Sequence, residues 1–393
     1  MLFRAVALTV GARIVSALLS FGVFSQVASS LAPASAARVL FFSFVFGFCL
    51  ATLRTFHLVA AKVVGGESRA GKLRRVRAAA QTLRGVMVWT VPTVLVLLLG
   101  QGVGWPVAAA GAVVVAFCGQ DLDLARSALG RHPVLPLLTA AGGVAALVLL
   151  ALSPDPSEAL CAVAFLVQWV PVVGVQLIFG RRLLPPVNRD TAMSPAWSTR
   201  VVNTGGLFLT SIFDGAVLNA PFIFAMPIAA AAAVDLALGN RLFVASLALF
   251  SLIASWVISG DIHRLAARAS LRPVATFVTL QLVISWATGS AYAVIYQFIT
   301  GNPVGLSAFV VFLVISLAYV MHATGLRYLV PRLSARVSVI AYAFSLGAFY
   351  AMLVWQHGGV AADLRVIVGS VTLALIAPPV VMWALLGHIR KGH

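Results

Sequence analysis

Two arginines and one histidine interrupt the first two apolar segments of this sequence. Arg13 lies nine residues after Arg4, and Arg54 lies eight residues before Lys62. In helices that rise about 1.5 Å per residue, both arginines would lie roughly 12–14 Å from the nearest basic end. Two guanidinium groups at similar depth repel each other unless an anion lies near, and their planar forks match phosphate oxygens. His57 follows Arg54 by one helical turn and shares its face, so Arg13, Arg54 and His57 form a candidate anion-binding site.

A structural role is the alternative for both arginines. Long basic side chains can extend along apolar surface and place the charged group at an aqueous interface. In that arrangement neither Arg13 nor Arg54 needs a ligand.

Three further polar residues fall deep inside apolar segments. Asp214 lies fourteen residues after Arg200, which places it about 21 Å into its segment. A carboxylate at that depth can form a cation or proton site, or it can pair with an arginine. Gln168 and Gln281 lie near the middle of their segments and could hydrogen-bond a polar ligand, although hydrogen bonding between helices is the favoured interpretation.

Other polar residues are predicted near the ends of the apolar segments. Asp235 and Arg241 are expected at the outer interface, where they could pair. The remaining residues of this kind lie within two turns of a basic loop and are interpreted as interfacial: Asp121, Asp123, Asp261, His263 and His322.

The composition indicates a membrane protein. Of 393 residues, 61% are hydrophobic and 9% are charged, and the mean hydropathy is +1.04. A soluble domain carries roughly 25% charged residues. Apolar runs of about twenty residues recur, and each is long enough to cross a hydrocarbon layer of roughly 30 Å. Because lipid cannot satisfy backbone polar groups, these runs should be helices, and they lack the alternation of barrel strands.

We predict an all-α polytopic membrane protein with about twelve transmembrane helices in two six-helix bundles. The first run is interrupted by Arg13 and lacks a clear cleavage site, so we interpret it as a retained helix rather than a signal peptide. The predicted helices are Ala5–Val27, Val39–Val64, Leu83–Gly102, Trp105–Leu124, Val134–Leu152, Ala159–Phe179, Val201–Phe224, Leu238–Ile262, Val274–Phe298, Val304–Ala323, Val337–Trp355 and Val366–Leu386. The segment 226–239 could extend the eighth helix or lie at the interface.

Basic residues concentrate in every second loop and at the C-terminus. These positions hold 20 of the 27 basic residues, so the positive-inside rule places them, and both termini, in the cytoplasm. We therefore expect a multi-pass protein of the cell inner membrane. This rule explains most of the net charge of +17 without a nucleic-acid partner. The basic cluster 69–77 could also bind an anionic lipid or a partner enzyme.

The longest predicted cytoplasmic loop, residues 181–200, contains three prolines and divides the chain into two halves. We predict an N-terminal six-helix bundle at 1–180, a linker at 181–200 and a C-terminal bundle at 201–393. Duplicated halves are a common plan of secondary transporters, whose substrate site lies between them near the bilayer midplane.

No enzyme signature is present in the sequence. It lacks a phosphate-binding loop of the Walker type, an HExxH motif and metal-ligand spacing, and no large outer loop is predicted. Cys49, Cys118 and Cys161 all fall in apolar runs and are interpreted as small buried hydrophobes. We therefore assign no catalytic residue, metal or cofactor.

Four stretches resemble the oligosaccharide-lipid flippases of the multidrug, oligosaccharidyl-lipid and polysaccharide exporter superfamily. They are GARIVSALLSFGVFSQVASSLAP (11–33), DLARSALGRHPVLPLL (123–138), NTGGLFLTSIFDGAVLNAPF (203–222) and IHRLAARASLRP (262–273). The resemblance implies two six-helix bundles around a V-shaped cavity. It also implies export of a polyprenyl-pyrophosphate-linked glycan to the outer leaflet, with this lipid-linked glycan as the substrate.

We accordingly expect a flippase for polysaccharide biosynthesis that works by alternating access. Its pyrophosphate would bind Arg13, Arg54 and His57, its sugars would bind Gln168 and Gln281, and Asp214 would couple to an ion. Membrane lipids are the expected partners, together with glycan-assembly enzymes as an alternative. Three other functions stay open: a drug or cation exporter of the same superfamily, a membrane-embedded transferase of glycan assembly, and a scaffold that transports nothing.

Overall fold

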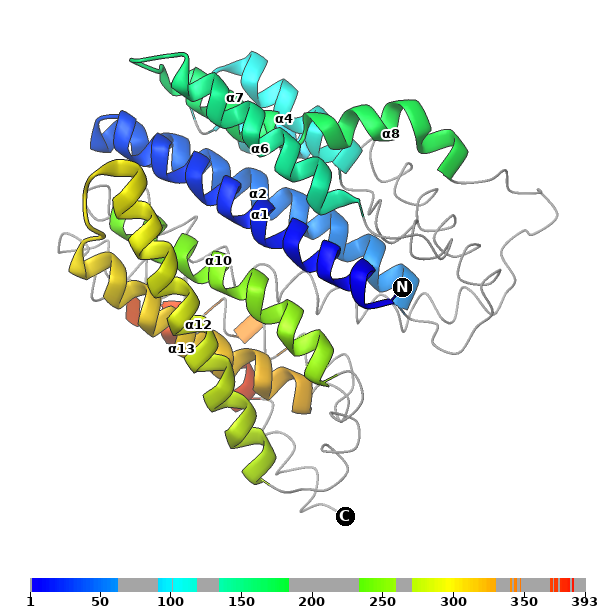
Figure 1. The fold of residues 1–393 in the computed structure, drawn as a ribbon, viewed down its shortest axis with the longest axis vertical. Coiled ribbons are helices and arrows are strands. Elements are labelled where there is room, and N and C mark those ends of the chain that lie inside the picture. The colour runs from blue at the N-terminus through cyan, green and yellow to red at the C-terminus, as the bar shows by residue number, and fades with distance from the viewer. Residues whose placement is uncertain are drawn as a thin grey trace. The chain divides into compact units, whose positions relative to one another are not determined.

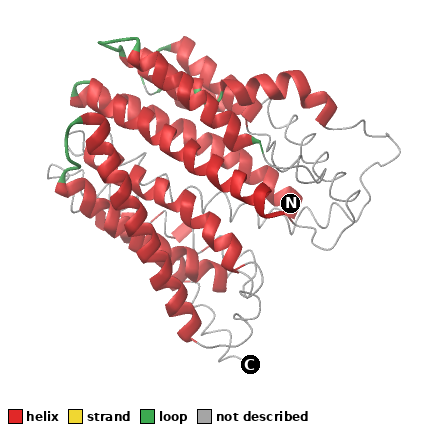
Figure 2. Cartoon of the chain, in the orientation of Figure 1, coloured by secondary structure: helices red, strands yellow, loops and turns green. Residues whose placement is uncertain are grey.

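The structure is a computed structural model, and its described part is helical throughout. It describes residues 2–62, 91–100, 102–118, 134–183, 233–258, 271–329, 340, 343–344, 347, 368–369, 371–373, 375–381 and 384. Every regular element in these ranges is an α-helix (Figure 1, Figure 2), which confirms the predicted all-α class. The chain divides into two compact units, residues 1–215 and 216–393.

The first unit begins with a long antiparallel hairpin, α1 (Leu2–Ser30) and α2 (Pro33–Lys62). Two residues separate the helices, and Pro33 opens α2, where its missing N–H costs nothing. The unit continues with a helical segment at 91–99 and then with α4 (Trp105–Cys118), α6 (Leu135–Ala151), α7 (Glu158–Val167) and α8 (Val170–Leu183). Helix α1 packs along α6, while α2 contacts α4 and α7 (Figure 1).

The predicted sixth helix is broken, which corrects the single span expected over Ala159–Phe179. Helices α7 and α8 meet at Gln168 and Trp169 with a bend of 46°. Pro171 explains the break because it has no N–H for the Val167 carbonyl and its ring collides with that carbonyl. At the opposite end of α7, Ser157 caps the helix by accepting a hydrogen bond from the Leu160 N–H at 3.2 Å.

The second unit contains α10 (Ala233–Ile258), α12 (Leu271–Thr300) and α13 (Leu306–Leu329), each packed on the other two. Residues 371–373 and 375–381 are also helical. Helix α10 begins five residues before the predicted eighth helix, so the end of the uncertain segment 226–239 extends that helix. Gly289 permits close packing, because a Cβ there would overlap the ring of Phe312, and small residues serve helix contacts in membranes in this way.

Three described helical segments are long and apolar enough to cross a membrane: Gly11–Ser30, Pro33–Leu50 and Val278–Thr300. The bent pair α7 and α8 makes a fourth if it counts as one span. The protein is therefore a multi-pass membrane protein. Of the predicted linker 181–200, the first three residues end α8, and the rest lies outside the described residues. The predicted seventh helix, Val201–Phe224, lies there as well.

Candidate functional site

The hairpin of α1 and α2 carries the predicted anion site. Arg13 precedes the end of α1 by 17 residues, and Arg54 follows the start of α2 by 21 residues. At 1.5 Å per residue, these positions are about 26 and 32 Å from the hairpin turn. The two helices pack side by side, so both positions fall toward the same end of the hairpin. Arg13 is exposed on this unit, whereas the side chains of Arg54 and His57 lie outside the described residues.

Helix α1 is positioned by contacts with α6 beside the Arg13 turn. Ser16 and Thr139 share a hydrogen bond of 2.7 Å between their hydroxyl groups. One turn further on, a Cβ at Gly143 would lie 2.8 Å from the Cβ of Leu19. These contacts place the backbone that carries Arg13 firmly against α6.

Gln168 lies at the break between α7 and α8. Its side chain is 7% exposed, and among the described residues it has no hydrogen-bond partner. Gly142 of α6 lies against its backbone, since a Cβ there would come within 2.6 Å of the Gln168 carbonyl carbon. The hydrogen bond between helices that the sequence favoured is not seen among the described residues. Discontinuous helices line the binding sites of many secondary transporters.

Gln281 of α12 is likewise buried without bonding across helices. It is 2% exposed, and its Oε1 atom accepts no hydrogen bond from any described residue. One turn further along α12, Ser285 shares a 2.8 Å hydrogen bond with Ser246 of α10. The serine pair therefore joins these two helices, whereas the amide stays available for another donor.

Asp235 and Arg241, which the sequence predicts near the outer interface, both lie in α10. Asp235 accepts a short hydrogen bond from the hydroxyl of Ser307, which lies in the first turn of α13. Asp235 itself lies in the first turn of α10. Its carboxylate therefore lies beside the N-termini of both α10 and α13, where negative charge is favourable. Asp214, the predicted ion-coupling residue, lies outside the described residues.

His322, which the sequence places within two turns of a basic loop, lies in α13 and is 1% exposed within the second unit. Its Nδ1 atom lies 2.6 Å from the carbonyl oxygen of Leu375, and its ring lies 6.3 Å from that of Tyr319. The sequence held one signal for this contact, because Pro379 removes the N–H that would otherwise bond the Leu375 carbonyl.

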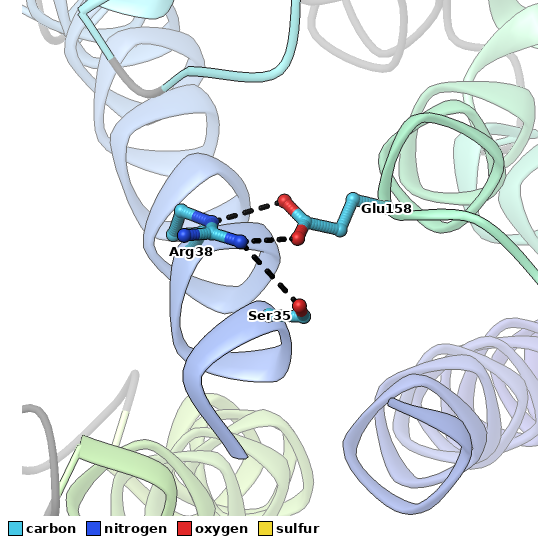
Figure 3. Close-up of polar contacts among 3 residues, drawn as sticks. All are labelled: Ser35, Arg38 and Glu158. Atoms are coloured by element: carbon cyan, nitrogen blue, oxygen red, sulfur yellow. Dashed lines mark hydrogen bonds and ion pairs between the residues drawn. The ribbon is translucent and has the colours of Figure 1, made fainter. Parts of the chain in front are cut away.

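An ion pair joins α2 to α7 (Figure 3). Arg38 donates from Nε to Glu158 Oε2 at 3.0 Å and from Nη2 to Glu158 Oε1 at 2.5 Å. The same Nη2 atom lies 3.4 Å from the hydroxyl of Ser35. The side chain of Arg38 is 56% exposed and that of Glu158 is 29% exposed. The pair therefore links α2 to the N-terminus of α7 but contributes little to stability. The sequence placed both residues in predicted outer loops but did not pair them.

The three cysteines are all buried, as predicted. Cys118 of α4 donates to the carbonyl oxygen of Trp169 at 4.0 Å. This weak bond falls at the break between α7 and α8, so three helices of the first unit meet beside Gln168.

Comparisons with known proteins agree at the level of the fold. No family model and no curated protein matches this sequence. An inward-facing multidrug resistance MATE family transporter of the MOP superfamily superposes with a TM-score of 0.62 at 13% identity, covering 96% of this chain and 94% of that one. An outward-facing MATE structure gives 0.55 at 13% identity over 98% and 95%. The Vibrio cholerae MATE transporter VcmN in its bent form gives 0.51 at 16% identity over 99% and 98%. This chain therefore has the fold of the MATE family transporters of the MOP superfamily.

Proposed function

We propose that this protein is a secondary transporter of the MOP superfamily that moves a polyprenyl-pyrophosphate-linked oligosaccharide across the inner membrane. The pyrophosphate binds near Arg13, Arg54 and His57, and the glycan contacts Gln168 and Gln281. Both termini are cytoplasmic, and the two halves alternate between inward-open and outward-open states.

The fold likeness supports the transport part of this proposal. The similar structures are transporters, described in both inward-facing and outward-facing conformations, and they align with nearly the whole chain. Fold alone does not assign a substrate, so the substrate must be argued from the residues.

The charge of the first two helices carries the substrate argument. Residues 1–66 contain no aspartate or glutamate, while Arg13 and Arg54 lie within α1 and α2. An intramembrane cation requires a counter-ion or water, and this hairpin supplies no carboxylate. A phosphate-bearing substrate meets that requirement, because guanidinium groups bind phosphate oxygens in a bidentate manner.

A cation-coupled exporter of drugs is the second candidate function. It is favoured by the description of the similar structures as multidrug resistance transporters. A cationic drug, however, would require acidic residues along its path, and Asp214 is the deep carboxylate that the sequence provides. A transferase of glycan assembly is a third function that the same experiment tests.

Purified protein in proteoliposomes distinguishes these functions. One probe is a polyprenyl-pyrophosphate oligosaccharide with a fluorophore on the glycan, and dithionite added outside bleaches only the outer leaflet. The other probe is ethidium, taken up under a cation gradient. We expect the protein to move the fluorescent lipid of the inner leaflet to the outer leaflet, so that dithionite bleaches it as well. We expect no ethidium flux. Ethidium flux without lipid movement would replace our proposal with drug export, and a new glycan product in the lipid extract would replace it with transferase activity.

A further inference from the structure

Helices α1 and α6 of the first unit pack side by side and run in the same direction. Ser16 of α1 meets Thr139 of α6 through a hydrogen bond of 2.7 Å. About one turn further along both helices, Leu19 meets Gly143. Arg13 lies one turn before Ser16, on the same side of α1. Arg13 is therefore level with the first turn of α6, which begins at residue 135.

The charges around Arg13 favour an anion. The Arg13 side chain is exposed on the first unit and forms no ion pair with a described residue. Neither α1 nor α6 contains an aspartate or glutamate, so neither helix repels an anion that approaches the guanidinium group. A cation inside a membrane protein requires a counter-ion or water, and these two helices supply no counter-ion.

The hydroxyl pair of Ser16 and Thr139 has a defined donor. The Oγ1 atom of Thr139 lies 2.9 Å from the carbonyl oxygen of Leu135 and 3.1 Å from that of Pro136. A carbonyl oxygen only accepts hydrogen bonds, and a threonine hydroxyl has one hydrogen. That hydrogen therefore points to its own helix. Ser16 is then the donor in its bond to Thr139.

Ser16 differs in this respect from other serines of the described helices. Ser25, Ser246 and Ser316 each donate to a carbonyl oxygen three or four residues earlier in their own helix. Ser16 has no such bond among the described residues, and it is half-buried rather than buried. Rotation of its hydroxyl group can therefore redirect the hydrogen to another acceptor without breaking a bond within either helix.

We propose that the Ser16 hydroxyl binds the pyrophosphate of the substrate together with Arg13. When the anion binds, Ser16 exchanges its bond to Thr139 for a bond to a phosphate oxygen. A hydrogen bond to a charged oxygen is roughly twice as strong as one between neutral groups, so the exchange favours the phosphate. This inference rests on the proposed function, and it names a further residue that recognises the same substrate group.

Two substitutions that break the same hydrogen bond test the proposal. The probe is inorganic pyrophosphate, titrated calorimetrically into the full-length protein in lipid nanodiscs. Ser16→Ala removes the donor, and we expect about five- to tenfold weaker binding. Thr139→Val keeps the shape of the side chain but removes the competing acceptor, and we expect binding that is up to about fivefold tighter. Ser25→Ala is the control, because Ser25 lies on the same helix and donates to the carbonyl oxygen of Phe21, and we expect wild-type affinity.

A purely structural contact gives a different result, because both substitutions then remove the same stabilising bond. Equal weakening by Ser16→Ala and Thr139→Val would overturn the proposal. Wild-type affinity in Ser16→Ala, or a wild-type protein that binds no pyrophosphate, would overturn it as well. If Ser16→Ala does not fold, the affinity of Thr139→Val still decides, since a structural contact predicts no gain.

The flux assay in proteoliposomes distinguishes this inference from the proposed function. Opposite shifts in pyrophosphate affinity, without movement of the lipid-linked glycan, would leave the anion site standing and overturn the transport of that lipid. Lipid movement by the wild type, together with unchanged pyrophosphate affinity in Ser16→Ala, would leave the transport proposal standing and overturn the role of Ser16.

Discussion

Replacing Gly142 by alanine should strain the bend between α7 and α8. A Cβ at residue 142 would lie 2.6 Å from the carbonyl carbon of Gln168 and 2.8 Å from its Cα, whereas ordinary contacts begin at 3.4 Å. The carbonyl oxygen of Gln168 lies closer still, so the helices must separate by more than about 0.8 Å at this point. Because the obstacle is backbone, no side-chain rotation relieves it, and overpacking of this kind costs about 1–3 kcal/mol.

Gly174→Ala is the matched control. Gly174 lies within α8 and a Cβ there meets no atom within 4 Å. Both substitutions gain up to about 1 kcal/mol from the higher helix propensity of alanine, so their difference isolates the steric term. We expect Gly142→Ala to be less stable than Gly174→Ala by about 1–3 kcal/mol, which is roughly a 5- to 150-fold difference in the unfolding equilibrium.

The assay is unfolding by sodium dodecyl sulfate in dodecyl maltoside micelles, followed by far-ultraviolet circular dichroism. Both variants are compared with the wild type at equal detergent and protein concentration. The midpoint should rise or stay level for Gly174→Ala and fall for Gly142→Ala. Equal midpoints for the two variants would refute the close approach of α6 to the backbone at Gln168.

Three other predictions concern charged residues. Arg54→Ala should reduce lipid-linked glycan flux about ten- to a hundredfold, because a lost charge-assisted bond to a desolvated phosphate costs about 1.5–3 kcal/mol. Arg54→Lys should show a smaller defect, and wild-type flux in Arg54→Ala and Arg13→Ala alike would contradict the pyrophosphate site. Asp214→Asn should abolish gradient-driven flux while substrate binding persists. Flux and binding are measured on the same preparation, and normal flux would show that the carboxylate does not couple transport to an ion. A double-mutant cycle of Arg38→Ala and Glu158→Ala should give a coupling energy below about 1 kcal/mol, because the pair is partly exposed. A much larger coupling energy would indicate that the pair is buried in the membrane.

The sequence predicted the fold class because its physical cause is local. Lipid cannot satisfy backbone groups, so a long apolar run must be helical whatever its neighbours are. The long helices α1, α2, α12 and α13 therefore follow directly from hydropathy. The start of α10 was less certain, since residues 226–239 are apolar on both sides of the true boundary at Ala233.

Site residues were predicted by type and depth but not by partner. Arg13 and Arg54 were placed toward the same end of a hairpin by counting residues alone. Gln281 was correctly placed inside a helix, whereas Gln168 lies at the break between α7 and α8. The expected bonds between helices are absent among the described residues. A side chain's partner depends on which face of another helix meets it, and hydropathy contains no information about that.

Tertiary structure decided the remaining features. Pro171 was visible in the sequence, but membrane helices often accommodate a proline. Only the structure shows that α7 and α8 meet at a 46° bend and that Gly142 packs against Gln168 there. Pro379 likewise predicts an orphaned carbonyl somewhere near Leu375. That His322, 53 residues earlier, supplies the missing donor depends on how α13 packs, because a buried acceptor must be satisfied by whichever donor the fold brings within reach.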